Sequence, residues 1–167
     1  MKKWVCFIFS VIFLFQTEPS LANSFNTSGA FYSGKYKNLF NSVLGKDEKI
    51  VAQKVNNTFS QLFYGNDSTE RVYYPVEPGM AYIEDVEYND VRSEGMSYGM
   101  MIAVQLNKQE EFNRLWKWAK TFMQQESGYF AWQLNTKGEI LDSTSASDGE
   151  EWIAMSLFFA SEIGRAH

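Results

Sequence analysis

Two acidic residues could do chemistry together, because each stands at the start of a stretch with helical periodicity. Glu94 lies between Ser93 and Gly95 and opens an apolar stretch that continues to Leu106. Asp148 opens a second such stretch, "ASDGEEWIAMSLFFAS". Two carboxyl groups held in different environments can divide the roles of proton donor and proton acceptor. The sequence therefore predicts acid–base chemistry by carboxyl groups.

Both acidic residues also have an ordinary structural explanation. Asp148 is a good N-cap with a glutamate three residues further on, and an acid in the first helical turn, such as Glu94, complements the helix dipole. For Glu94 this explanation is incomplete, because Ser93 could already cap the helix. Gly95 and Gly99 weaken that helix by up to about 1 kcal/mol each relative to alanine. Glycines there would let substrate or another chain approach closely. Burial beneath aromatic loops and a second carboxylate both raise a carboxyl pKa, so we expect Glu94 to be an acid that holds its proton at neutral pH.

Histidine and cysteine contribute little to the possible chemistry. The single histidine is the last residue, His167, and the single cysteine is Cys6. Ser-His-Asp and Cys-His catalysis therefore lack a base, and we expect no metal and no cofactor. A calcium loop in "YIEDVEYND" is an alternative, although its spacing does not fit an EF-hand and solvated loop charge is the simpler account. Its candidate ligands are Glu84, Asp85, Glu87, Asn89 and Asp90.

The N-terminus has the pattern of a secretory signal peptide. Lys2 and Lys3 precede twelve mostly apolar residues, and Ser20-Leu21-Ala22 offers small residues at the cleavage site. We expect residues 1–22 to be removed and the protein to be secreted or periplasmic, with no membrane association afterwards. Of 15 basic and 20 acidic residues, two basic and one acidic lie in this segment, so the exported part carries a net charge of −6. This acidity argues against a nucleic-acid partner.

Four helices follow from the apolar spacing. We expect them at residues 47–64, at 93–106, at 109–125 and from about 148 onward. Residues 65–92 show no sustained period. A short β-hairpin is expected near 129–141, around the turn from Asn135 to Gly138.

These lengths fix a geometry for the two acidic residues. The tight connection at 107–108 makes the second and third helices antiparallel neighbours, and both long connections then lie at the opposite end. The second and fourth helices both begin at that end and run parallel. Glu94 and Asp148 are therefore expected to face the same cleft.

At these residues the sequence resembles glycoside hydrolase family 8, in particular its xylanase and reducing-end xylose-releasing exo-oligoxylanase members. The resemblance runs from "GAFYSGKYKNLF" through "QLFYGNDSTERVYYPV" and "DVRSEGMSYGMMIAVQ" to "GYFAW" and "ASDGEEWIAMSLFFAS". It covers nearly all of the exported chain. Gly149-Glu150 departs from the broader family signature and is typical of the xylan-acting branch.

The resemblance implies a fold, a reaction and site residues. The fold is an all-α (α/α)6 toroid, and the reaction is inverting hydrolysis of β-1,4 glycosidic bonds in xylan or xylo-oligosaccharides. Glu94 matches the general acid, and Asp148 matches a second carboxylate that positions the sugar and the attacking water. Trp132, with Tyr129 and Phe130 as further candidates, matches the aromatic walls that bind sugar. The implied partner is an oligosaccharide or polysaccharide substrate.

A complete toroid needs about 350 to 400 residues in this family, so we expect residues 23–167 to be the N-terminal part of a truncated catalytic domain. About two of the six helical hairpins would be present. The resemblance places the catalytic base downstream, so the chain is expected to be inactive alone. Apolar faces of the first, third and fourth helices would lack neighbours. Two alternatives stay open: a non-catalytic secreted sugar-binding protein, and an endoglucanase or chitosanase of the same family.

Overall fold

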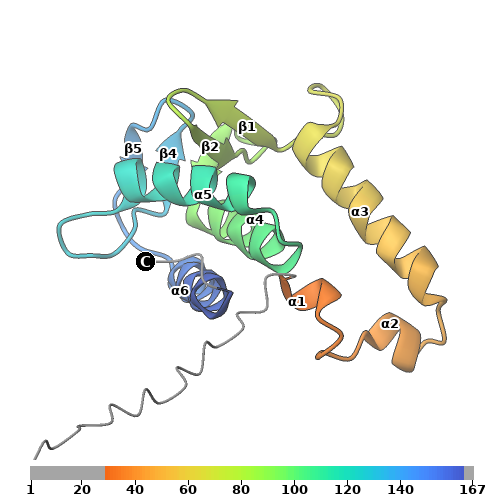
Figure 1. The fold of residues 1–167 in the computed structure, drawn as a ribbon. Helices are drawn as coiled ribbons and strands as arrows, with labels where there is room; N and C mark the ends of the chain where they lie inside the picture. The colour runs from red at the N-terminus through yellow and green to blue at the C-terminus, as the bar shows by residue number, and fades with distance from the viewer. Residues whose placement is uncertain (1–28, 164–167) are drawn as a thin grey trace, which may run out of the picture.

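The computed structural model describes residues 29–163, in which α4 lies at the centre of the helices, with α5 on one side and α6 on another (Figure 1). The expected signal peptide, residues 1–22, lies outside the described residues. Within residues 29–163, every helix is too short or too polar to cross a membrane. The helices are α1 (Gly29–Tyr32), α2 (Leu39–Ser42), α3 (Glu48–Tyr64), α4 (Ser93–Gln105), α5 (Gln109–Trp118) and α6 (Ser147–Glu162), with a π-helical turn η1 (Ala119–Met123).

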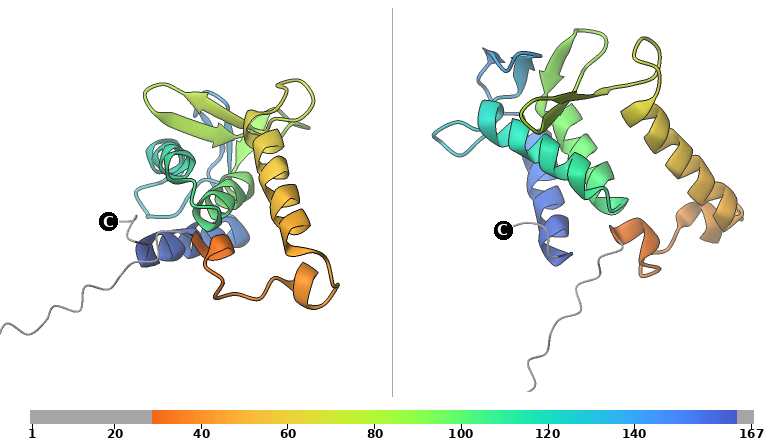
Figure 2. Two further views of the ribbon diagram at one scale, coloured as in Figure 1. Left: turned by 45° about the vertical axis from the view of Figure 1, so that its right-hand side comes forward. Right: turned by 45° about the horizontal axis from the view of Figure 1, so that its top comes forward.

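Helix α3 stands apart from the other long helices, as both views in Figure 2 show. It starts at a side-chain cap, because Asp47 Oδ1 accepts hydrogen bonds from the backbone N–H groups of Lys49 and Ile50. Only two of its side chains, Phe59 and Phe63, are buried. Ile50, near its start, is 65% exposed. The expectation that this helix lacks neighbours along part of its apolar face is therefore confirmed.

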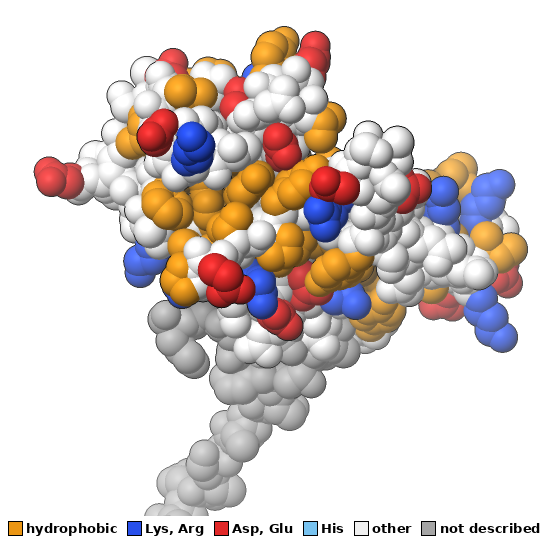
Figure 3. All heavy atoms as spheres, turned by 90° about the horizontal axis from the view of Figure 1, so that it is seen from above, with side chains coloured by type: hydrophobic (Ala, Val, Ile, Leu, Met, Phe, Trp, Pro, Cys, Tyr) orange, Lys and Arg blue, Asp and Glu red, His pale blue; other side chains and the backbone are white. Residues whose placement is uncertain are grey.

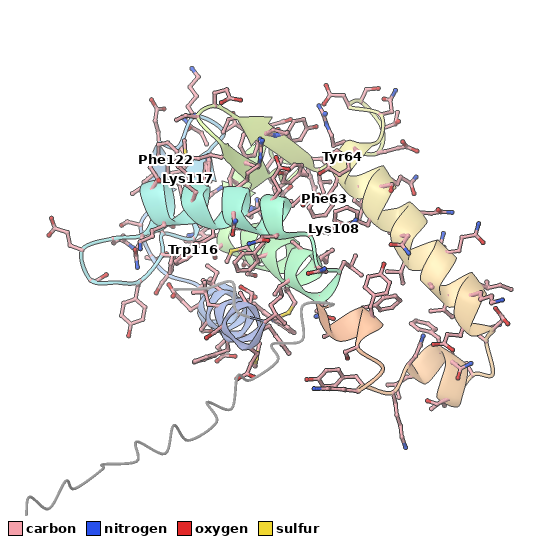
Figure 4. The ribbon with its side chains drawn as sticks, in the orientation of Figure 1. Phe63, Tyr64, Lys108, Trp116, Lys117 and Phe122 are labelled. Atoms are coloured by element: carbon pink, nitrogen blue, oxygen red, sulfur yellow. The ribbon has the colours of Figure 1, made fainter. Side chains whose placement is uncertain are left out.

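The C-terminal end of α3 is the part that packs. Phe63 stacks on Tyr73 with ring centroids 4.9 Å apart, and the Tyr64 hydroxyl donates a hydrogen bond to Glu111 Oε1 of α5 at 2.6 Å. The ammonium of Lys108, at the N-cap position of α5, lies 4.8 Å from the centroid of the Phe59 ring. Figure 4 shows Phe63, Tyr64 and Lys108 between α3 and α5. Ring contacts, hydrogen bonds and a cation–π contact at this end thus join α3 to β1 and α5.

The segment 65–92, which shows no period in the sequence, contains three strands. They are β1 (Tyr73–Val76), β2 (Met80–Ile83) and β3 (Asp90–Arg92). β1 and β2 form an antiparallel hairpin in which Tyr73 pairs with Ile83. Each strand has only three or four residues, and Pro75 lies inside β1, so the alternation that indicates a strand is too short to detect. The all-α expectation therefore missed this hairpin.

The expected hairpin near 129–141 is confirmed as β4 (Gln133–Asn135) and β5 (Ile140–Asp142), which pair antiparallel. Its turn is closed by the Asn135 side chain, which accepts hydrogen bonds from the backbone N–H groups of Lys137 and Glu139. β3 adds a third strand on the other side of β4. The residues just before α4 are thereby fixed to the residues just after Trp132.

Helix α5 has its apolar face covered, which corrects the expectation that this face would lack neighbours. Leu115 is fully buried and Trp118 is 1% exposed. Strand β2 packs on α5, and the Tyr82 and Trp118 ring centroids are 5.8 Å apart. The β1–β2 hairpin, which the sequence did not indicate, covers the apolar face of α5. The helix expected at 109–125 is α5 followed by the π-helical turn, because the last five helical residues adopt wider hydrogen bonding.

Helix α6 has one buried and one open side. Ile153, Ser156 and Ala160 are buried. On its exposed side Trp152 is 42%, Met155 48% and Phe158 71% exposed. The expectation of an uncovered apolar face on this helix is confirmed.

Helices α4 and α6 touch at their starts. A β-carbon built on Gly149 would lie 2.3 Å from Ser93 Oγ and 2.8 Å from Ser93 Cβ, so only glycine fits at this position. Farther along, the rings of Tyr98 and Trp152 meet edge to face, with centroids 6.1 Å apart. Contacts between early residues and then between later residues of both helices mean that α4 and α6 run parallel, as expected.

Gly95 and Gly99 have a different neighbour from the one the sequence suggested. Ile83 of β2 packs over both, with Cγ2 3.4 Å from the position of a β-carbon on Gly95 and Cγ1 2.6 Å from that on Gly99. The two glycines therefore admit a strand of the same chain rather than a substrate. The expectation of substrate or another chain at these glycines is wrong.

Gly149→Ala should destabilise the protein, because the added methyl group would force α6 away from the serine on α4. We expect a loss of about 1–3 kcal/mol in the free energy of unfolding, measured by urea denaturation. Gly95→Ala is the matched control: its methyl group would meet Ile83 at an ordinary contact distance and would favour the helix. Equal stability of Gly149→Ala and the native protein would contradict this packing.

Candidate active site

The starts of α4 and α6 bring the two predicted acidic residues to one end of the molecule. Glu94 is in the first turn of α4 and Asp148 in the first turn of α6. Both three-stranded and two-stranded sheets lie at this same end (Figure 1). Because the neighbouring residues Ser93 and Gly149 are in contact, Glu94 and Asp148 flank a direct helix–helix contact. The expectation that both helices begin at the same end and run parallel is confirmed, and a common cleft for the two acidic residues stays a prediction.

Glu94 has one carboxylate oxygen that is buried and unpartnered. The residue is half-buried, and its Oε2 has no hydrogen-bond partner among the described residues. Buried polar atoms in native proteins nearly always have a partner. A buried carboxyl oxygen without one, at a helix N-terminus, is a place where a ligand oxygen can complete the hydrogen bonding.

Asp148 is exposed and does not cap its helix, which corrects the expectation of an N-cap. The N-cap position is held by Ala146, without a side-chain hydrogen bond. Asp148 Oδ1 accepts a hydrogen bond from the adjacent Gly149 N–H at 2.9 Å. Its position in the first turn still complements the helix dipole, and its exposed carboxylate is free to contact a ligand.

Ser93 does not cap α4 either. The N-cap position belongs to Arg92, and the Ser93 hydroxyl is buried without a hydrogen-bond partner among the described residues. The Ser93 backbone N–H donates to the Trp132 carbonyl oxygen at 2.9 Å. The strand β3 therefore continues its pairing into the first helical residue, and this pairing places Trp132 beside the start of α4.

Trp132 is half-buried and held by polar groups at this end of the molecule. Its backbone N–H donates to the Thr144 carbonyl oxygen at 2.8 Å. A hydrogen bond with the Trp132 side chain, together with hydrogen bonds from Thr144, holds the pKa of Asp142 below its ordinary value. Among the three predicted aromatic walls, Trp132 is thus the one whose backbone is bonded to the start of α4, one residue before Glu94.

The other two predicted walls differ from each other. Tyr129 is 59% exposed, and its carbonyl oxygen accepts a hydrogen bond from the Gln125 N–H. Phe130 is only 5% exposed, and its ring centroid lies 6.1 Å from that of Trp116. In this structure Phe130 is a core residue, because Trp116 and the buried core enclose the ring that would have to face sugar. Tyr129 keeps an accessible ring.

Glu150 has a positioning role that the sequence did not indicate. Its Oε1 accepts a hydrogen bond from the Phe130 backbone N–H at 2.6 Å. This contact ties the segment before Trp132 to the first turn of α6. The sequence marks this position only as an acidic residue in the first turn of the last helix, which the helix dipole already explains.

The acidic loop before α4 is paired with arginine. Arg92 makes ion pairs with Asp85 at 3.2 Å and with Asp90 at 3.1 Å, and Asp85 Oδ1 also accepts the backbone N–H groups of Glu87 and Tyr88. Residues 29–163 contain no group of three or more His, Cys, Asp or Glu side chains that could hold a metal ion. The calcium alternative therefore has no support in the described residues.

Two hollows in the described surface lie away from the acidic pair. One, of about 400 Å³, runs between α3 and α4 and is almost entirely apolar, with Phe59, Leu62 and Ile102 among its lining residues. The other, of about 710 Å³, lies around α1 and α2. Neither is lined by Glu94 or Asp148. Hydrophobic side chains also lie across the centre of the face seen from above (Figure 3).

A family model described as Glycosyl hydrolases family 8 matches residues 77–165, a range that contains both acidic residues and Trp132. The chain belongs to glycoside hydrolase family 8. The resemblance expected from the motifs is confirmed, and the helical hairpins described above are part of the (α/α)6 toroid of that family.

Similar proteins and solved structures agree with this family assignment. The reducing-end xylose-releasing exo-oligoxylanase Rex8A of Paenibacillus barcinonensis is 48% identical over 137 residues, which are 80% of this chain and 36% of the relative. The reducing end xylose-releasing exo-oligoxylanase of Halalkalibacterium halodurans is 42% identical over 81% of this chain and 35% of the relative. The structure of Rex8A complexed with xylose has a TM-score of 0.71 at 47% identity, over 80% of this chain and 36% of that chain. The chain spans about a third of the length of these relatives.

Glu150→Ala should free the segment before Trp132, because the Phe130 N–H would lose its carboxylate partner. We expect faster amide hydrogen exchange at Phe130 and a loss of about 1–3 kcal/mol in unfolding free energy, measured by NMR and by urea denaturation. Glu151→Ala, at an exposed position on the same helix turn, is the control and should leave both unchanged. An unaltered exchange rate at Phe130 in Glu150→Ala would refute the role of this contact.

Proposed function

We propose that the protein to which this chain belongs hydrolyses β-1,4 glycosidic bonds in xylan or xylo-oligosaccharides with inversion, and that Glu94 is the general acid. The observation that carries the proposal is the buried, unpartnered Oε2 of Glu94 at the start of α4. The names of the relatives, exo-oligoxylanases that release xylose from the reducing end, support xylo-oligosaccharides as the substrate class.

In the proposed mechanism Glu94 donates a proton to the departing glycosidic oxygen. A leaving sugar oxygen at the Oε2 position would complete the hydrogen bonding that the protein itself leaves open. Asp148, exposed beside it, accepts hydrogen bonds from the sugar and the attacking water. Inversion needs a second carboxylate that activates water from the opposite face of the ring, about 6.5–9.5 Å away. No residue of this chain is proposed for that role.

Trp132 would supply the apolar surface for the sugar ring. An indole face stacks on the C–H groups of a pyranose, and its fixed orientation costs little conformational entropy on binding. Tyr129, with an accessible ring at the same end, is a second candidate.

We further propose that the protein is secreted or periplasmic. The support is the N-terminal pattern of two lysines, an apolar run from Trp4 to Phe15 and the small residues Ser20 and Ala22. A polymeric substrate such as xylan is too large to enter a cell, which agrees with an exported enzyme.

A sugar-binding protein without turnover is the rival from another class, and one substitution separates the two. The matched part of Rex8A is replaced by the corresponding part of this chain, and xylose release from xylotetraose is measured. Glu94→Gln should lower kcat by at least about 100-fold, because the amide cannot donate the proton, while binding changes little. Glu87→Gln, an exposed acid in the loop before α4, is the control with unchanged kcat.

Full activity of the Glu94→Gln chimera would remove Glu94 from the acid role. Equal affinity for xylotetraose and no turnover in both the native and the Glu94→Gln chimera would favour the binding protein instead.

A further inference from the structure

Arg92 occupies a position that its charge alone does not favour. It is the N-cap residue of α4, where the positive end of the helix dipole disfavours a cation. It makes no side-chain cap hydrogen bond. Contacts of its side chain with other residues must therefore stabilise Arg92 at this position, two residues before Glu94.

The guanidinium of Arg92 is held on its polar edge by two carboxylates. Its Nη1 lies 3.2 Å from Asp85 Oδ2, and its Nε lies 3.1 Å from Asp90 Oδ1. Asp90 is only 3% exposed and also accepts a hydrogen bond from the Gln133 side-chain amide. Because Gln133 is the first residue of β4, this network joins the arginine to the strand that follows Trp132.

The same guanidinium lies over two aromatic rings. The Arg92 Cζ lies 4.4 Å from the centroid of the Tyr88 ring and 5.6 Å from that of the Trp132 ring. A guanidinium whose edge is fixed by carboxylates has little rotational freedom, so the rings against it are fixed as well. The Trp132 ring therefore lies against a guanidinium that is itself held in place by Asp85 and Asp90.

We propose that Arg92 is a positioning residue that sets the orientation of the Trp132 ring, and through it the affinity for xylo-oligosaccharides. The second clause rests on the proposed function, and the first does not. Asp85 and Asp90 hold the guanidinium in place, and Tyr88 covers it from the solvent side of the loop, where the tyrosine is 59% exposed. A lysine at this position would keep the charge and lose the flat surface that the rings contact.

The test compares the full 167-residue chain with its Arg92→Lys variant by NMR, using the Trp132 indole N–H resonance, which is assigned by its absence in Trp132→Phe. Arg92→Lys should shift this resonance and speed its hydrogen exchange. Arg71→Lys is the matched control, because Arg71 also pairs with an aspartate, Asp67, and lies 4.8 Å from the Tyr74 ring centroid, in a different loop. An indole signal in Arg92→Lys identical to that of the native chain overturns the proposal.

A second variant decides the matter if Arg92→Lys does not fold, as judged by circular dichroism. Tyr88→Leu removes a ring from the guanidinium at an exposed site and should shift the indole resonance in the same direction by a smaller amount. An unchanged indole in the folded Tyr88→Leu chain also overturns the proposal.

Titration with xylotetraose, followed by tryptophan fluorescence, tests the consequence for binding. The Kd should rise about three- to tenfold in Arg92→Lys and stay unchanged in Arg71→Lys. A native chain that binds no xylotetraose would refute the claim about affinity, while the indole comparison would still decide the role of Arg92 and the chimera would still decide the proposed function. An altered indole with an unchanged Kd would refute the claim about affinity.

Discussion

Gly149 at the start of α6 leaves no room for a side chain, because Ser93 of α4 fills the space in which a β-carbon would lie. This contact sets how closely the two parallel helices approach at their N-terminal ends. Glu94 follows the serine and Asp148 precedes the glycine, so both acidic residues are sequence neighbours of this helix–helix contact.

Short strands and loops hold the surrounding aromatic side chains near the starts of α4 and α6. The backbone N–H of Ser93 bonds to the Trp132 carbonyl oxygen, which extends the β3–β4 pairing into the first residue of α4. On the other side, Glu150 binds the Phe130 N–H and so fixes the start of the aromatic segment to α6. The helices hold the acids, and the sheet and loops hold the aromatic and arginine side chains around them.

The sequence predicted the long helices and the common end of α4 and α6 well, since apolar spacing over about three turns or more is a strong signal and the lengths of the connections fix which ends meet. It did not predict β1 and β2, because strands of four residues that include Pro75 give no measurable alternation. Because of that omission, two expectations were wrong. Gly95 and Gly99 lie against Ile83 and not against a substrate, and the apolar face of α5 is covered by β2. Both depend on a contact between segments far apart in the chain.

The site shows the same division between local and non-local information. Glu94 and Asp148 could be placed from motif and helix boundary alone. Their capping roles could not, because a cap depends on which backbone N–H groups are already paired, and Ser93 is paired with Trp132 instead. The burial of Phe130 depends on Trp116, fourteen residues earlier, and the contacts of Arg92 depend on two loops and a strand.

The most direct test of the α4–α6 contact is nuclear Overhauser spectroscopy of the purified chain. The structure predicts strong cross-peaks between the α-protons of Gly149 and the β-protons of Ser93, since a β-carbon on the glycine would lie 2.8 Å from Ser93 Cβ. Absence of these cross-peaks in the folded chain, with both residues assigned, would mean that the helices do not meet at their starts and that Glu94 and Asp148 do not share a site.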